Sequence, residues 1–279
     1  MLKSSNELIE KLSFTFRKSL LYKYLKKIKI LRLLREKTGK VIGDWMLYNF
    51  RLHGDKIHLN TLRKIIKEHG ISSIVETGTY LGYATELFAK TFPDLQIYTC
   101  EINKDFYLKA KKNLAEIKNV HVYNESSPEF IESLIKNDLL GDRPFFYLDA
   151  HWLDDWPLEK ELQLISKKIK TAVISIDDFK VYNDNRFVFD KYKDKECSLE
   201  LVAPNLKKNN EYQVLFPHYG KEELYKDKII HPDLIGYVII FQNMAREFES
   251  LKKNNFIKRY YMDGSDVLKK TLLCGKKIF

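Results

Sequence analysis

Residues 74–85 read IVETGTYLGYAT, and this stretch decides the fold that the chain is expected to adopt. A short apolar run ends at Glu76 and turns through two glycines into a helical pattern. The apolar run predicts a buried strand, Gly78 permits a tight turn at its carboxyl end, and Gly82 permits close packing of the next helix. A ligand of nucleotide shape would therefore lie against main-chain N–H groups of this turn.

The residues inside the turn count against a phosphate-binding motif. The dinucleotide motif G-x-G-x-x-G needs a second glycine where Tyr80 stands, and a P-loop needs Gly-Lys-Ser/Thr where Gly82 precedes Tyr83. The pattern apolar-apolar-Glu-x-Gly-x-x-x-Gly instead resembles motif I of class I S-adenosylmethionine-dependent methyltransferases; an ordinary strand-turn-helix is the alternative. The resemblance implies that five loop residues bind S-adenosylmethionine: Glu76, Thr77, Gly78, Tyr80 and Gly82.

A second acid follows the next apolar run. Residues 95–100 predict a strand that ends at Glu101, 25 positions after Glu76. An acid at this strand tip suits a ribose, because two adjacent hydroxyls can donate to one carboxylate. The alternative is that Glu101 caps the helix that begins near Asn103 or Lys104.

A third strand, residues 120–123, is followed by a loop with two serines. By the same resemblance, Ser126 or Ser127 would contact the adenine of the cofactor. Either serine could instead be the N-cap of the helix that begins at Pro128.

The remainder of the chain continues to alternate between helical and strand patterns, which predicts an α/β, doubly wound Rossmann-like sheet. The resemblance implies seven strands with an antiparallel last pair. The expected helices span residues 104–117, 128–137 and 157–169, and the further strands span 144–148, 172–176, 212–216 and 235–241.

Three aspartates stand at the tips of the fourth and fifth predicted strands. Asp149 follows the fourth strand, and the pair Asp177-Asp178 follows the fifth, 28 positions later. Because these strands are neighbours in the expected order, their carboxylates would converge and repel one another. An all-oxygen cluster of this kind favours a hard divalent cation such as Mg²⁺.

This arrangement resembles the macrocin-type, metal-dependent sugar O-methyltransferases, and cephalosporin hydroxylase-like proteins share the layout. The resemblance implies that Asp149, Asp177 and Asp178 bind the metal, which would hold two oxygens of a sugar acceptor, and that Asp149 also contacts S-adenosylmethionine. Candidates for the catalytic base are His151, Asp149 and Lys180. Residues 180–234 form an insertion where acceptor specificity would be carried.

Charge is concentrated at the N-terminus. Residues 1–40 hold twelve Lys and Arg against three Glu, so +9 of the net charge of +10 lies there. Leu21, Leu25 and Ile28 recur at helical spacing, which predicts a basic amphipathic helix. Its apolar face could cover the main domain, join subunits into a homo-oligomer, or contact an anionic inner membrane surface. Nucleic acid is not the expected partner, because the basic residues occupy one helix without an RNA-binding signature.

Composition agrees with one α/β domain in a cytoplasmic enzyme. We expect an N-terminal extension over residues 1–55, a methyltransferase domain over 56–245 and a C-terminal extension over 246–279. Three scattered cysteines form neither a disulfide framework nor a zinc site. The sequence thus predicts methyl transfer from S-adenosylmethionine to a sugar hydroxyl with a divalent metal. A metal-independent methyltransferase for protein, lipid or RNA, and a non-catalytic cofactor-binding scaffold, are the alternatives.

Overall fold

The computed structural model describes residues 51–150, 156–225, 233–249, 251, 254–262, 272–273 and 276–277. The chain forms two compact units, a larger one of Ile57–Tyr219 and Ile235–Phe279 and a smaller one of Met1–Lys56 and Gly220–Leu234. The predicted basic helix of residues 1–40 lies outside the described residues. No helix in the described part of the chain has both the length and the apolar character needed to span a membrane.

One sheet with helices on both faces forms the larger unit. Its strands are β1 (Ser73–Thr77), β2 (Gln96–Cys100), β3 (Val120–Tyr123), β4 (Pro144–Leu148), β5 (Ala172–Ile176), β9 (Tyr212–Pro217), β11 (Val238–Gln242) and β12 (Ile257–Met262). The helices are α5 (Lys56–Glu68), α6 (Tyr83–Thr91), α7 (Lys104–Asn113), α8 (Ser127–Lys136), α9 (Leu158–Lys168), α10 (Leu199–Val202) and α12 (Ala245–Glu249).

Shorter elements lie in the loops and near the ends of the described chain. They are η1 (Arg51–Gly54), β6 (Phe187–Val188), β7 (Lys191–Tyr192), β8 (Lys195–Glu196), η2 (Ala203–Asn205), α11 (Lys221–Tyr225), β10 (Leu234–Ile235), β13 (Leu272–Leu273) and β14 (Lys276–Lys277).

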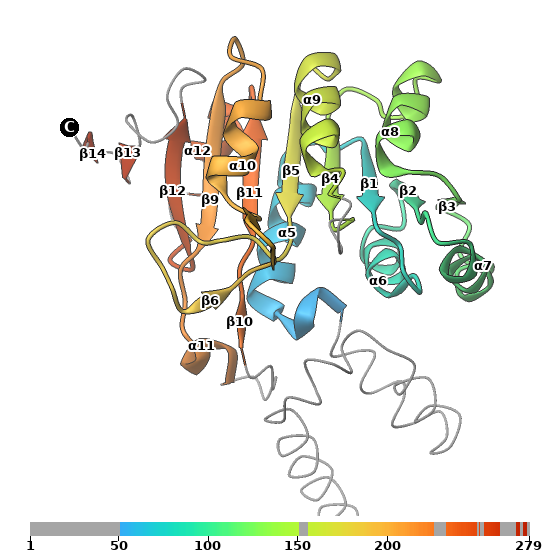
Figure 1. Ribbon diagram of the computed structural model, residues 1–279, viewed down its shortest axis with the longest axis horizontal. Helices are drawn as coiled ribbons and strands as arrows, with labels where there is room; N and C mark the ends of the chain where they lie inside the picture. Colours follow the sequence, from blue (N-terminus) through green and yellow to red (C-terminus); the bar gives the residue numbers. More distant parts are fainter. Residues whose placement is uncertain are drawn as a thin grey trace, which may run out of the picture. The chain divides into compact units, whose positions relative to one another are not determined.

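The sheet has the order β12-β9-β11-β5-β4-β1-β2-β3, and its strands lie side by side in Figure 1. β1 to β5 run parallel to one another, whereas β11 lies between β5 and β9 and is antiparallel to both. The predicted doubly wound sheet with antiparallel strands at its end is therefore confirmed. β12 adds an eighth strand, antiparallel to β9.

Strand order reverses at β1, and this reversal positions the candidate site. β2 and β3 follow on one side of β1, and β4 and β5 lie on the other. Because crossovers between parallel strands are right-handed, α6 and α7 cover one face of the sheet, and α8 and α9 cover the other. β1, β4 and β5 are buried along their whole length. Their carboxyl ends meet at one edge, at the switch point where such folds bind ligands.

The last predicted strand, 235–241, is shorter than expected because Gly236 interrupts it. The Gly236 N–H donates to the Val188 carbonyl at 2.9 Å, and its carbonyl accepts from the Phe179 N–H at 2.8 Å. A Cβ at Gly236 would lie 2.0 Å from the Phe179 carbonyl oxygen. Gly236 thus anchors the loop after β5, which carries Asp177 and Asp178, instead of extending the strand.

β12 arises from residues that the sequence analysis assigned to a C-terminal extension. Tyr260 of β12 packs edge-on against Phe216 of β9, with ring centroids 5.5 Å apart, and against Tyr182 of the insertion at 5.6 Å. At least six residues of this segment are therefore part of the sheet, where they cover the edge of β9.

Candidate active site

The turn after β1 is held by the end of β2. The N–H groups of Gly78 and Thr79 both donate to the Cys100 carbonyl at 3.0 Å. Gly78 has a φ of 87°, a left-handed conformation that favours glycine. A Cβ at Gly78 would lie 2.4 Å from the carbonyl oxygen of Asp149. Glycine is therefore required here by the close approach of the loops after β1 and β4.

Gly82 occupies the N-cap position of α6 with a φ of 84°. Its N–H donates to the Thr79 carbonyl at 2.8 Å, which closes the turn. A Cβ at Gly82 would lie 2.8 Å from Cδ1 of Leu114, just after α7. The left-handed backbone and the Leu114 side chain therefore favour glycine here, and close packing of the helix on its strand stays a prediction.

The side chain of Glu76 is buried near the carboxyl end of β1, on the face of the sheet that α6 covers. Its Oε2 accepts hydrogen bonds from the hydroxyl of Thr85 in α6 and from that of Thr99 in β2, the latter at 2.7 Å. Burial raises the pKa of Glu76 to about 7, although both hydroxyls lower it. The acid thus joins β1, β2 and α6 directly beneath the glycine turn.

Glu101 holds the two loops that flank it. Oε2 accepts from the Tyr80 N–H and Oε1 accepts from the Asn103 N–H, both at 2.8 Å. Tyr80 has a φ of 50°, so the carboxylate stabilises a left-handed residue in the turn. The helix cap is Asn103, whose Oδ1 accepts from the N–H groups of Asp105 and Phe106. A carboxylate has about four lone-pair sites, so Glu101 can still accept from hydroxyls of a ligand.

The two serines after β3 have different environments. Ser126 is the N-cap residue of α8, and its hydroxyl donates to Oε2 of Glu129 at 2.7 Å. Ser127, the first residue of α8, is buried. Ser126 is therefore the N-cap, which was one of the two roles expected for these serines. Contact of either serine with adenine stays a prediction.

The three predicted metal ligands all follow strands that end at one edge of the sheet, but Asp149 is not among the described residues whose ligand atoms lie within 4.8 Å of one another. A carboxylate oxygen of Asp177 and one of Asp178 lie within 4.8 Å of each other. Desolvation raises the pKa of Asp149 well above its usual value, and the charges of Asp177 and Asp178 raise it further. Burial and these two charges therefore both disfavour the ionised form of Asp149.

Tyr147 of β4 contributes to this edge, and the sequence analysis missed it. Its hydroxyl donates to Oδ2 of the buried Asp177 at 2.6 Å. Burial and the charges of Asp177 and Asp149 hold the pKa of this phenol well above 10. Tyr147 therefore remains a hydrogen-bond donor that orients the carboxylate of Asp177.

The insertion folds back onto the loop after β5. The Asp190 N–H donates to the Asp178 carbonyl at 2.8 Å, and the Lys180 N–H donates to the Cys197 carbonyl at 2.7 Å. The charge of Asp190 is among the causes that raise the pKa of Asp149. Asp190 is thus a fourth acid near the edge, and no spacing within the sequence could have placed it there.

Lys180, one of the predicted bases, is held in an ion pair. Its Nζ lies 2.6 Å from Oε2 of Glu196, and the hydrogen bond to that carboxylate raises the pKa of Lys180. Lys180 is therefore cationic at neutral pH, which disfavours a role as general base. His151, the other side chain proposed for this role beside Asp149, lies outside the described residues.

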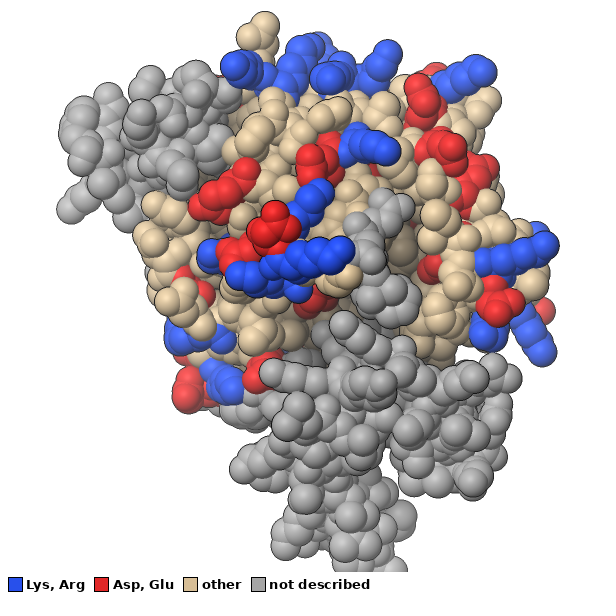
Figure 2. All heavy atoms as spheres, viewed as in Figure 1, with Lys and Arg blue, Asp and Glu red and all other residues tan. Residues whose placement is uncertain are grey.

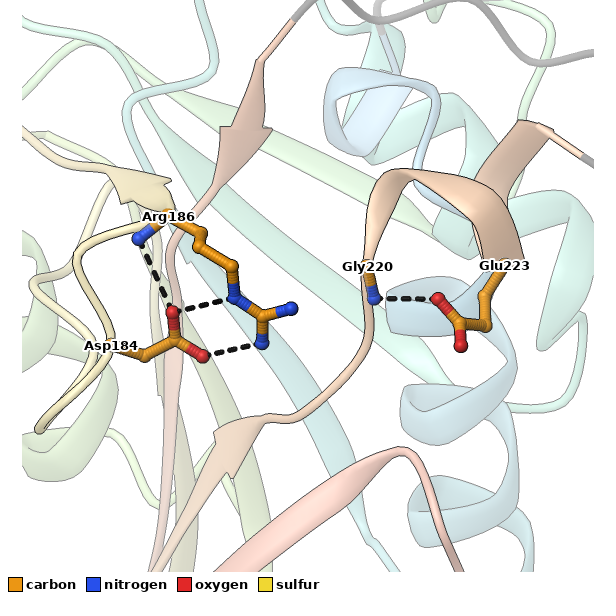
Figure 3. A network of polar contacts seen from close by, with 4 residues as sticks. All are labelled: Asp184, Arg186, Gly220 and Glu223. Atoms are coloured by element: carbon orange, nitrogen blue, oxygen red, sulfur yellow. Dashed lines mark hydrogen bonds and ion pairs between the residues drawn. The ribbon is translucent and has the colours of Figure 1, made fainter.

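Polar contacts also fix the first loop of the insertion and the start of α11 in the smaller unit. The Asp184 carboxylate accepts from Nε and Nη2 of Arg186 at 2.8 and 2.6 Å (Figure 3). Separately, the Gly220 N–H donates to Oε2 of Glu223 at 2.6 Å (Figure 3). Over most of the face in Figure 2, basic and acidic side chains are interspersed.

Two further residues near the turn were not predicted. Ile102, next to Glu101, is 67 % exposed, the highest value for a large hydrophobic side chain in the described residues. Glu161 of α9 is buried beneath β1, and burial raises its pKa to about 7. The position of Ile102 beside Glu101 is visible in the sequence, whereas the burial of Glu161 depends on helix packing.

Comparisons with known proteins found partial likenesses among solved structures and no match by sequence. The sequence matches no protein-family model and no curated protein. Among solved structures, a Staphylococcus aureus protein provisionally described as a caffeoyl-CoA O-methyltransferase is 17 % identical with a TM-score of 0.47, covering 81 % of this chain and 98 % of that chain. A Klebsiella pneumoniae protein provisionally described as an O-methyltransferase is 19 % identical with a TM-score of 0.48, covering 76 % and 94 %.

A third similar structure carries a ligand. The O-methyltransferase from Bacillus cereus, in complex with SAH, is 16 % identical with a TM-score of 0.45, covering 67 % of this chain and 81 % of that chain. At these identities the likeness concerns the fold alone. The Rossmann-like fold of this chain rests on its own strand order and parallel pairing.

Proposed function

We propose that this chain is an S-adenosylmethionine-dependent O-methyltransferase that acts on a hydroxyl of a sugar or sugar-containing small molecule with help from a divalent metal. The observation that carries the proposal is the division of carboxylates at one sheet edge. Glu76 and Glu101 lie around the turn after β1 and form the donor half of the site. Asp149, Asp177 and Asp178 follow β4 and β5 and form the acceptor half.

The donor half fits S-adenosylmethionine chemically. Glu101 can accept from the two ribose hydroxyls while it holds the Tyr80 and Asn103 N–H groups. The exposed side chain of Ile102 can pack on the adenine ring, which would explain an aliphatic residue 67 % exposed beside an acid. Gly78 leaves no side chain between the turn and Asp149. When bound, S-adenosylmethionine supplies a methyl group on a positively charged sulfur.

The acceptor half fits a hard divalent cation. Two oxygens on one ion are at most twice the metal–oxygen distance apart, which is about 4.2 Å for Mg²⁺ and about 5 Å for Ca²⁺. The 4.8 Å limit on the separation of Asp177 and Asp178 oxygens is compatible with such a pair of ligands. When bound, the cation supplies positive charge that favours the deprotonated form of an acceptor hydroxyl. The sugar acceptor is proposed from the resemblance in aspartate spacing alone.

The chain's own residues would position the two substrates. The Gly78 and Asp149 backbones fix the distance between the two halves, because they approach with no room for a Cβ. Tyr147 holds Asp177 in one orientation through its hydroxyl. His151 and Asp149 remain the proposed acceptors of the hydroxyl proton, and the cationic Lys180 is better suited to hold Glu196.

Methyl transfer to a panel of nucleotide sugars and glycosides, with SAH release as the readout, tests the proposal. We expect turnover that requires added Mg²⁺ or Mn²⁺ and stops with EDTA. Calorimetry with S-adenosylmethionine in EDTA serves as the matched control, since the donor half should bind without metal. Undiminished transfer in EDTA would refute the metal requirement, and binding without turnover on any acceptor would favour a scaffold.

A further inference from the structure

Glu161 is a buried acid that the proposed reaction does not use. It lies in α9 with 1 % of its surface exposed, although an acid in this helix would ordinarily face solvent. Its charge raises the pKa of Cys100, the residue of β2 that stands in register with Thr77. Glu161 therefore lies beneath the ends of β1 and β2, on the face covered by α8 and α9.

Two hydroxyls accompany this carboxylate. Thr77 ends β1 and Ser127 begins α8, and both side chains lie close enough to the Glu161 carboxyl to lower its pKa. Oε1 of Glu161, Oγ1 of Thr77 and Oγ of Ser127 are all buried, and none makes a hydrogen bond of ordinary geometry within the described residues. Buried polar oxygens that lie together in this way are ordinarily satisfied by hydrogen bonds to one another.

The β1 tip is thus flanked by a buried acid on each face. Glu76 is bonded to Thr85 and Thr99 on the α6 face, and successive side chains of a strand point to opposite faces. Thr77 accordingly points to the other face, where Glu161 and Ser127 meet it. The glycine turn begins one residue later, so the position of Thr77 sets that of the turn.

We propose that Glu161 is a positioning residue of the donor site, which couples the turn after β1 to the first turn of α8 through Thr77 and Ser127. The two coupled segments are those expected to contact the methionine end and the adenine of the donor. The inference rests on the proposed function only for the identity of that donor. The coupling itself is a property of the free protein.

Hydrogen–deuterium exchange of the free protein tests the coupling. In Glu161→Leu, amide exchange should accelerate about tenfold in both residues 77–82 and residues 126–130. Glu161→Gln should restore most of the protection, because an amide can bond both hydroxyls. Glu159→Leu is the matched control on the same helix, since Glu159 pairs at the surface with Lys195. Faster exchange confined to α9, or equal effects in the control, would overturn the proposal.

Single hydroxyl deletions keep the test decisive if Glu161→Leu fails to fold. Thr77→Val should accelerate exchange at residues 126–130, and Ser127→Ala should accelerate it at residues 77–82. Absence of either cross effect contradicts the coupling. Calorimetry should also show S-adenosylmethionine binding about tenfold weaker in Glu161→Leu than in Glu161→Gln. If wild type binds no S-adenosylmethionine, the proposed function fails, while the exchange result still decides the coupling.

Discussion

The donor half and the acceptor half are both built from carboxylates, but the groups around those carboxylates differ. Glu76 accepts from two threonine hydroxyls, and Glu101 accepts from two backbone N–H groups. At the acceptor half, the charges of Asp177 and Asp178 act on Asp149 and raise its pKa. The donor half is therefore organised by the protein's own hydrogen bonds, whereas the carboxylates of the acceptor half disfavour one another's ionised forms.

The largest expected effect is on turnover, and it comes from a change in the acceptor half that leaves the donor half intact. Asp177→Asn should lower turnover about a thousandfold, because it removes a charged metal ligand, and should leave S-adenosylmethionine affinity within about threefold. Steady-state assays and calorimetry measure the two quantities. Tyr147→Phe is the control, since it keeps the carboxylate and removes only its hydrogen bond; we expect a loss of about tenfold to a hundredfold. Equal loss of donor affinity and turnover in Asp177→Asn would show that the halves are not separable.

The next prediction concerns the point where the halves meet. Gly78→Ala should destabilise the protein by at least about 3 kcal/mol more than Gly70→Ala, because the new Cβ would meet the Asp149 carbonyl. Gly70 has a similar left-handed backbone, with φ 63°, but its Cβ would meet only Arg143 Nη1 at 4.0 Å. Urea unfolding measures the loss of stability in both variants. Since both pay a conformational cost of about 1–2 kcal/mol, the difference between the two losses reports the clash. Equal destabilisation would mean that the two loops can separate.

The pH dependence of stability tests the burial of the donor half. The pKa of Glu76 is about 7 in the folded protein against an ordinary 4.5, so its contribution to the free energy of unfolding is fully present below pH 4.5. This contribution is lost as pH rises through 7, by about 3 kcal/mol. As pH rises, the free energy of unfolding of wild type should therefore fall by this amount relative to that of Glu76→Gln, in which residue 76 cannot titrate. Glu161 titrates in the same range in both proteins and cancels. A stability difference constant from pH 4 to 8 would contradict the prediction.

The smallest expected effect distinguishes ribose recognition from loop support at Glu101. Glu101→Gln should weaken S-adenosylmethionine binding about thirtyfold, because one acceptor oxygen becomes a donor that faces a backbone N–H. Asn103→Ala removes the cap of α7, and should cost about 1 kcal/mol of stability with little change in affinity. Calorimetry and thermal unfolding compare them. Similar affinity losses in both variants would reduce Glu101 to a structural role.

The sequence predicted the bounds of the parallel strands closely, because the patterns that mark these strands are local. The predicted strands 144–148 and 172–176 have the observed bounds of β4 and β5, since continuous apolar runs mark buried parallel strands. Sequence reasoning failed where distant residues decide the outcome. The predicted strand 235–241 is interrupted at Gly236 because its backbone bonds Phe179 and Val188, and β12 forms because β9 offers an edge.

By itself the sequence determined which segments form the parallel strands and which acids follow them, whereas the order of the strands was expected from the family resemblance. Apolar period and strand alternation carry the first kind of information, and parallel strands end at the same edge. Only the tertiary structure decided what surrounds each acid: the hydroxyls at Glu76 and Glu161, the phenol at Asp177, and the ion pair that disfavours Lys180 as a base. Those neighbours come from elements far apart in the chain, so their contacts depend on packing, which no local pattern encodes.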